Sequence, residues 1–175
     1  MVRSDNMTNL MFIETGAEDL DLIQPLWEKL NEHHQNKKSD FQDHYENFTF
    51  QERKEALIEK AHGGFMRIDL VKDEKSNIYV GYCITTISPE HEGEVDSIYV
   101  EKKCRSRGIG DQLMKRSLAW MERKDVKTKE VAVAIGNQEA ISFYERYGFR
   151  PRIIILKQVN QSDKRRIEFE SKEFR

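Results

Sequence analysis

Residues 94–123 read EVDSIYVEKKCRSRGIGDQLMKRSLAWMER. The first seven alternate as a strand does, and residues 108–123 have the spacing of an amphipathic helix. Between them lies a glycine-rich turn, residues 105–110, which exposes backbone amides where the helix begins. The helix dipole and two arginines add positive potential at this point, so the turn predicts a site for a pyrophosphate group.

Two standard nucleotide-binding motifs are absent from this turn. Leu113 stands where the dinucleotide-binding fingerprint has its third glycine, and no Gly-Lys-Ser/Thr follows as it does in a P-loop. A glycine pair at the start of a helix is also explained if it only allows the chain to make a tight turn. The phosphate interpretation therefore needs support from a second motif.

Composition limits the class of protein. The chain has 175 residues, 38% of them hydrophobic, so we expect a single domain over residues 1–175 with a flexible start at 1–9. With 29 basic and 31 acidic residues, a net charge of −2 gives no bias toward nucleic acid. Cys83 and Cys104 are too few for a disulfide framework or a zinc site. No apolar run has the length of a signal peptide or membrane span, which predicts a cytoplasmic protein without a membrane partner.

The periodicity of the chain predicts its fold. Apolar and alternating runs predict strands at 10–14, 65–71, 78–88, 94–100, 130–135, 150–158 and 166–169. Helical spacing predicts one helix that begins near residue 18 and others at 51–61, 108–123 and 138–147. Short connections favour antiparallel strands before residue 100, whereas the crossover helix should join two parallel strands. This order predicts an α/β (α+β) fold, a mixed central sheet of about six to seven strands with about four helices on both faces.

The second motif is NQEAISFYERYGF, residues 137–149. Asn137 stands at a helix start, where its side chain can cap, and Tyr144 lies about two turns further along the same face. Gly148 ends the helix, and Phe149 is expected to be buried where the chain leaves the helix. A capped helix with a core tyrosine explains the same residues.

In this order, and separated by one strand, the two motifs resemble those of the GNAT superfamily of N-acetyltransferases. Residues 105–110 match its acetyl-CoA signature, which is Arg or Gln, two residues, Gly, one residue, and Gly or Ala. Its downstream pattern is matched at Asn137, Ala140, Tyr144, Gly148 and Phe149. The resemblance covers residues 78–157 and implies a GNAT-like acetyltransferase domain that uses acetyl-CoA as co-substrate, with no metal.

The resemblance also implies roles for single residues. The main chain at Ile98, Tyr99 and Val100 would bind pantetheine as an added strand, and Asn137 would contact the pantetheine arm. Tyr144 would lie near the sulfur as the general acid that protonates the departing thiolate. The pyrophosphate would be held by backbone amides of the glycine turn, at Arg105, Ser106, Arg107, Gly108, Ile109, Gly110 and Asp111.

The acceptor amine must lose a proton before it attacks, and a nearby carboxylate can take that proton directly or through a water molecule. In the family an acid at this distance before the glycine turn often serves as base, which makes Glu94 the expected base. Asp96 follows two residues later on the same strand face and could share the role. A solvated or salt-bridged carboxylate explains these two acids equally well.

The acceptor is expected to be a small-molecule primary amine. Acids interleaved with aromatics in residues 32–50 suit a cationic amine, although a solvated acidic helix face with core aromatics explains them as well. Alternatives are a peptide N-terminus or protein lysine as acceptor, a non-catalytic acyl-CoA sensor, and a different phosphorylated ligand. A homodimer through residues 150–169 is left open. We expect no metal site, because no further ligands complete a set with His33, His34 and His44.

Overall fold

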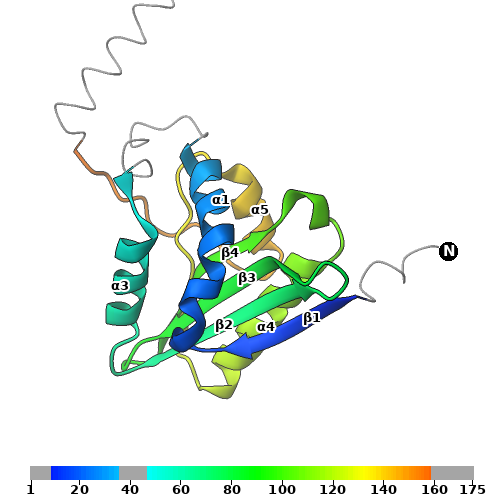
Figure 1. Ribbon diagram of the computed structural model, residues 1–175. Coiled ribbons are helices and arrows are strands. Elements are labelled where there is room, and N and C mark those ends of the chain that lie inside the picture. Colours follow the sequence, from blue (N-terminus) through cyan, green and yellow to red (C-terminus); the bar gives the residue numbers. More distant parts are fainter. Residues whose placement is uncertain (1–8, 36–46, 159–175) are drawn as a thin grey trace, which may run out of the picture. The chain divides into compact units, whose positions relative to one another are not determined.

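The computed structural model describes residues 9–35 and 47–158 (Figure 1). They fall into two compact units. The sheet unit contains residues 9–30 and 49–132, and the C-terminal unit contains residues 31–35, 47–48 and 133–158. The expected single domain over residues 1–175 stays a prediction. His44, most of the residues 32–50 discussed above as an acceptor region, and the strand expected at 166–169 lie outside the described residues.

One mixed sheet forms the centre of the sheet unit. Its order is β1-β2-β3-β4-β5, with antiparallel pairs from β1 to β4 and a parallel pair between β4 and β5. The antiparallel strands and the parallel pair on either side of the crossover helix are therefore confirmed. The strand bounds are β1 Leu10–Thr15, β2 Phe65–Asp73, β3 Ile78–Ile87, β4 Glu92–Val100 and β5 Thr128–Glu130.

The predicted helices are present close to their expected positions, and the short 3₁₀ helix η2 Lys102–Cys104 was not predicted. The other described helices are η1 Ala17–Ile23, α1 Gln24–Gln35, α3 Phe50–Lys60, α4 Ile109–Arg123 and α5 Gln138–Glu145. The helix expected from residue 18 starts as the 3₁₀ helix η1 and becomes α-helical at Gln24. Pro25 fits there because the first turn of an α-helix needs no backbone donor from it. Helix α3 begins in a capping box, in which Thr49 and Glu52 exchange side-chain to backbone hydrogen bonds.

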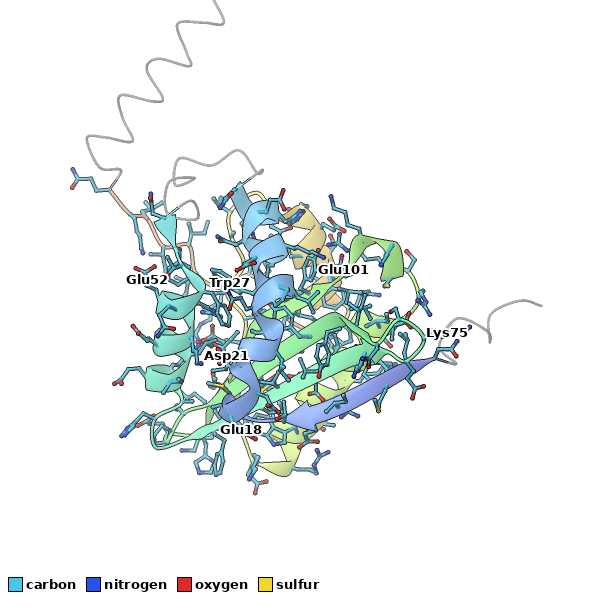
Figure 2. All side chains as sticks on the ribbon, viewed as in Figure 1. Glu18, Asp21, Trp27, Glu52, Lys75 and Glu101 are labelled. Carbon is cyan, nitrogen blue, oxygen red and sulfur yellow. The ribbon has the colours of Figure 1, made fainter. Side chains whose placement is uncertain are left out.

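Helices cover both faces of the sheet within this unit. Figure 1 shows α4 behind the sheet and η1, with the start of α1, in front of it, while α3 lies at the left. Trp27, labelled in Figure 2, packs against Phe50 with ring centroids 5.5 Å apart. This contact joins the first turn of α1 to the first turn of α3. On the other face, Thr85 Oγ1 and Ser117 Oγ lie 2.7 Å apart in a buried hydrogen bond between β3 and α4.

Two predicted strands are wrong in whole or in part. Residues 150–158 form no regular structure, and Ile153, Ile154, Ile155 and Leu156 are between 73% and 90% exposed. Their branched side chains suit a strand, but a strand also needs a hydrogen-bonded neighbour. The strand expected at 130–135 is the short β5, which ends at Glu130 opposite Glu94. The described sheet therefore has five strands rather than six to seven.

A buried ionic cluster joins α4 to β2. Arg67 donates to both carboxylate oxygens of Asp69, at 2.7 and 2.8 Å, and Arg116 Nε donates to Asp69 Oδ1 at 2.6 Å. The side chains of Arg67 and Asp69 are almost fully buried. Buried charges of this kind remain ionised only when they are paired, so the three side chains depend on one another.

Replacement of Asp69 by Asn should therefore destabilise the protein strongly. We expect the free energy of unfolding, measured by urea denaturation, to fall by about 3–5 kcal/mol, because Arg67 and Arg116 both lose the buried carboxylate that compensates their charge. Glu14→Gln is the control, since Glu14 also pairs with Arg67 but is 56% exposed; its effect should stay below about 1 kcal/mol. Similar midpoints and slopes for Asp69→Asn and wild type would contradict this account.

Candidate active site

The glycine turn has the backbone shape of an anion site. Ser106 and Gly108 both adopt left-handed conformations, with φ of 61° and 80°, and Gly108 is the N-cap of α4. Turns with such residues line a concave surface with backbone N–H groups. The first intrahelical bond runs from Gln112 N to Gly108 O at 3.0 Å, so the helix offers no acceptor to the amides of Ile109 and Gly110.

The residues present fit a pyrophosphate. A Cβ built on Gly108 would meet no atom within 4 Å, so the backbone there faces open space among the described atoms. Arg105 fastens the turn to the end of β4, because its Nε donates to Val100 O at 3.0 Å and its guanidinium lies 5.7 Å from the Tyr99 ring centroid. The pKa of Asp73 is lowered first by a hydrogen bond from the Ser76 amide, then by further local hydrogen bonds and by the positive charge of Arg107.

A β-bulge shapes the middle of β4. Ile84 pairs with Ser97 and Thr85 pairs with Val95, so Asp96 is an extra residue on β4. Pairing with β5 ends at Glu94, just before this bulge. Within the sheet unit, the β4 edge beyond Glu94 therefore has no strand beside it, and that edge includes Ile98, Tyr99 and Val100. An open edge offers backbone groups to an extended ligand.

Glu94 and Asp96 lie on the same face of β4, as period two predicts. Lys60, the last residue of α3, contacts both carboxylates, with its Nζ 2.5 Å from Asp96 Oδ1. Burial of Lys60 acts to lower its pKa, but hydrogen bonds to Asp96 and Glu94 more than offset this, so its pKa lies above the usual value. Both acids are thus held by one ammonium group.

The two carboxylates differ in their surroundings. The Asp96 side chain is 2% exposed, and its Oδ2 accepts a hydrogen bond from Thr86 Oγ1 at 2.7 Å. The Glu94 side chain is 22% exposed, and Lys60 is its one partner among the described residues. Glu94 is therefore the acid with more freedom to meet an incoming amine.

The C-terminal unit carries the second motif. Asn137 caps α5, because its Oδ1 accepts from Ala140 N at 3.3 Å. The Tyr144 ring packs edge-on against Phe143 and Phe149, with centroids 5.2 and 6.0 Å apart. The predicted cap is thus present, whereas the roles of Asn137 and Tyr144 toward a cofactor stay predictions.

Sequence analysis missed three features of this site, namely Lys60, Thr86 and the bulge at Asp96. A lysine in the last turn of a helix is usually solvated and interacts favourably with the negative end of the helix dipole. The partners of Lys60 and the bulge at Asp96 have no local sequence signal. Both depend on how β4 pairs with its neighbours. The capping box at Thr49 was a signal that could have fixed where α3 begins.

Neither thiol in the structure suits nucleophilic chemistry, and no metal site is evident. Cys83 and Cys104 are both buried, and burial raises the pKa of Cys83 to about 12. Across residues 9–35 and 47–158, no group of three or more His, Cys, Asp or Glu side chains could hold a metal ion. In the same residues, no helix has both the length and the apolar character needed to cross a bilayer. The cytoplasmic location stays a prediction.

Comparison with known proteins gives the family. The model of the acetyltransferase (GNAT) family matches residues 26–149, which is well over half of the chain. The chain therefore belongs to the acetyltransferase (GNAT) family. The resemblance inferred from the two motifs and the fold class inferred from the order of strands and helices are confirmed.

Individual relatives are more distant. An uncharacterized N-acetyltransferase of Methanocaldococcus jannaschii is 29% identical over 72 residues. That match covers 41% of this chain and about a third, 32%, of the relative.

Solved structures of similar fold include aminoglycoside N-acetyltransferase AAC(6')-Iy in complex with CoA, with a TM-score of 0.62 at 13% identity over 85% of this chain and 94% of that one. The same enzyme with the bisubstrate analogue CoA-S-monomethyl-acetylneamine gives 0.59 at 14% identity over 86% and 99%. A ribosomal-protein-alanine N-acetyltransferase from Brucella melitensis biovar Abortus 2308 gives 0.57 at 17% identity over 85% and 98%. At these identities the likeness shows the fold alone.

Replacement of Gly108 by Ala tests the anion site. A Cβ in the left-handed region costs about 1–2 kcal/mol of stability. It would also enter the open space above the turn, and loss of one charged hydrogen bond there, about 1.5–3 kcal/mol, should weaken CoA binding about tenfold or more by calorimetry.

Gly63→Ala is the matched control, because Gly63 also has a positive φ, 74°, but lies beside Pro89 at the opposite end of the sheet unit. Its stability should fall to a similar extent while CoA affinity is unchanged. Equal CoA affinity in Gly108→Ala and Gly63→Ala would rule out the turn as the binding site.

Proposed function

We propose that this chain is an acetyl-CoA-dependent N-acetyltransferase, which transfers the acetyl group to a primary amine by direct attack in a ternary complex. One observation carries the proposal: a GNAT-family chain has the left-handed turn at Ser106 and Gly108, next to a β4 edge that has no strand beside it beyond Glu94 within the sheet unit. These two features suit the two halves of one ligand, a diphosphate and an extended arm.

Binding of the co-substrate would rest largely on backbone groups. The amides of residues 105–111 would hold the pyrophosphate, and the main chain of Ile98, Tyr99 and Val100 would pair with the pantetheine arm, which Asn137 would contact. The bound CoA of AAC(6')-Iy supports this co-substrate for a chain of the same family and fold. Acetyl-CoA supplies an already activated thioester, so the protein mainly has to orient the reactants.

We assign the base role to Glu94. It is the more exposed of the two acids, whereas Asp96 is buried and uses both oxygens in contacts with Lys60 and Thr86. Glu94 would accept the proton that the acceptor amine loses on attack. Tyr144 would donate a proton to the departing thiolate, a role supported by its place in the family motif.

The favoured acceptor is a small-molecule amine. Support comes from the fold shared with an aminoglycoside acetyltransferase that binds a bisubstrate analogue. A peptide or protein amine is the alternative, and the fold shared with the Brucella melitensis ribosomal-protein-alanine N-acetyltransferase favours it. A homodimer through residues 150–169 stays a prediction.

Thiol release tests the activity and separates an enzyme from a sensor. The protein is mixed with acetyl-CoA and a panel of aminoglycosides, polyamines and short peptides with free N-termini, and free CoA thiol is measured. An enzyme releases thiol above background with at least one member of the panel. A sensor shows a raised melting temperature with CoA but no release, and no calorimetric heat with CoA would exclude both.

Glu94→Gln should lower kcat by about 10²–10⁴, the usual contribution of a general base. CoA affinity should not change, because Glu94 lies before the edge that would bind pantetheine. Glu92→Gln is the matched control, an exposed acid two residues earlier on the same strand, and should keep wild-type turnover. Turnover of Glu94→Gln equal to that of the control would exclude the base role.

Tyr144→Phe should slow turnover without loss of CoA binding, because it removes only the phenolic proton donor. Tyr147→Phe, three residues later beyond the end of α5, is the control. Steady-state turnover is measured for both variants from neutral to mildly alkaline pH. An unchanged kcat in Tyr144→Phe across this range would exclude the acid role.

A further inference from the structure

Lys60 connects two elements at the candidate base. It is the last residue of α3, and its ammonium group contacts Glu94 and Asp96 on β4, which are 34 and 36 residues away in sequence. It contacts Asp96 Oδ1 at 2.5 Å and the Oε2 of Glu94. One cation therefore bridges both acids.

This bridge differs from an ordinary surface ion pair. Lys54, six residues earlier on the same helix, pairs at 2.6 Å with Asp21, whose side chain is 68% exposed. Lys60 instead pairs with Asp96, whose side chain is 2% exposed. A buried carboxylate needs a compensating partner, and the two-residue period of the strand places this one on the same face of β4 as Glu94.

The other polar groups around the two acids cannot replace that ammonium. On α3, Arg53 donates through Nη2 to the backbone oxygen of Asp96 at 2.9 Å rather than to either carboxylate. On β3, Thr86 donates a neutral hydrogen bond to Asp96. Tyr82, also on β3, stays neutral because burial raises its pKa, and its hydroxyl bonds to Ser97 on β4 at 2.7 Å.

We propose that Lys60 is a positioning residue of the active site, which holds the Glu94 and Asp96 carboxylates side by side on β4 and balances their charge. The inference rests on the proposed role of Glu94 as base. Asp96 keeps Lys60 and Thr86 as permanent partners, while the more exposed Glu94 exchanges Lys60 for the acceptor amine. Lys60 itself touches no reacting atom.

Lys60→Met removes the ammonium and keeps an unbranched side chain. Two carboxylates on one face then repel each other without a cation, so the pair holds a proton up to higher pH. With the best amine from the thiol-release panel, we expect the acidic limb of the kcat/KM profile to move up by about 1–3 pH units. CoA affinity should be unchanged. Lys60→Arg should restore the wild-type limb, and Lys54→Met should not move it.

A measurement without turnover separates this inference from the proposed function. Carboxyl ¹³C NMR titration of wild type and Lys60→Met, with Glu94→Gln and Asp96→Asn for assignment, reports the pair directly. A titration midpoint of the pair that rises in Lys60→Met supports the inference, and an unchanged midpoint overturns it whatever the activity.

Loss of turnover in Glu94→Gln with an unmoved acidic limb in Lys60→Met also overturns it. Wild-type turnover in Glu94→Gln overturns the base role instead. Lys60→Gln serves as the second neutral variant if the methionine disturbs the end of α3.

Discussion

The extra residue in β4 sets the geometry of the whole candidate site. Because Asp96 has no counterpart on β3, the side chains of Asp96 and Ser97 both meet groups on the α3 face of the sheet, where they bond to Thr86 and Tyr82. The parallel pairing with β5 stops at Glu94. Bulges commonly re-aim side chains and end pairing next to active sites. The bulge thus places Ser97 on the same face as the Glu94 and Asp96 pair, and it lies where the pairing with β5 ends within the sheet unit.

The two faces of the sheet use charge differently. On the α4 face, Asp69 is enclosed by two arginines, and a cluster of this kind holds elements in a fixed arrangement. On the α3 face, one lysine shares two acids, and the side chains of Lys60 and Glu94 are 38% and 22% exposed. The first cluster has a buried core, because the Arg67 and Asp69 side chains are 4% and 1% exposed, whereas in the second both Lys60 and Glu94 reach solvent. The cluster that stabilises the fold and the cluster of the candidate active site therefore lie on opposite faces of one sheet.

Local patterns predicted most of the sheet unit. The strands at 65–100, helix α4 and the turn at 105–110 all have signals within a short window, either alternation, helical spacing or paired glycines. The bulge and the Lys60 contacts have no such signal, because they depend on register and on residues more than 30 positions apart. The strand expected at 150–158 failed for a related reason. Composition shows that a segment suits a strand but does not supply a neighbour for it.

Within the sheet unit, the β4 edge without a neighbouring strand also has a consequence for the behaviour of this unit in solution. Unpaired strand edges act as templates on which other chains add strands, and proteins that keep them need protection against self-association. The bulge supplies part of that protection, because it interrupts the regular spacing that an intruding strand would require. A ligand lying along the edge would supply the rest, so the bound form should resist aggregation better than the free form at equal concentration.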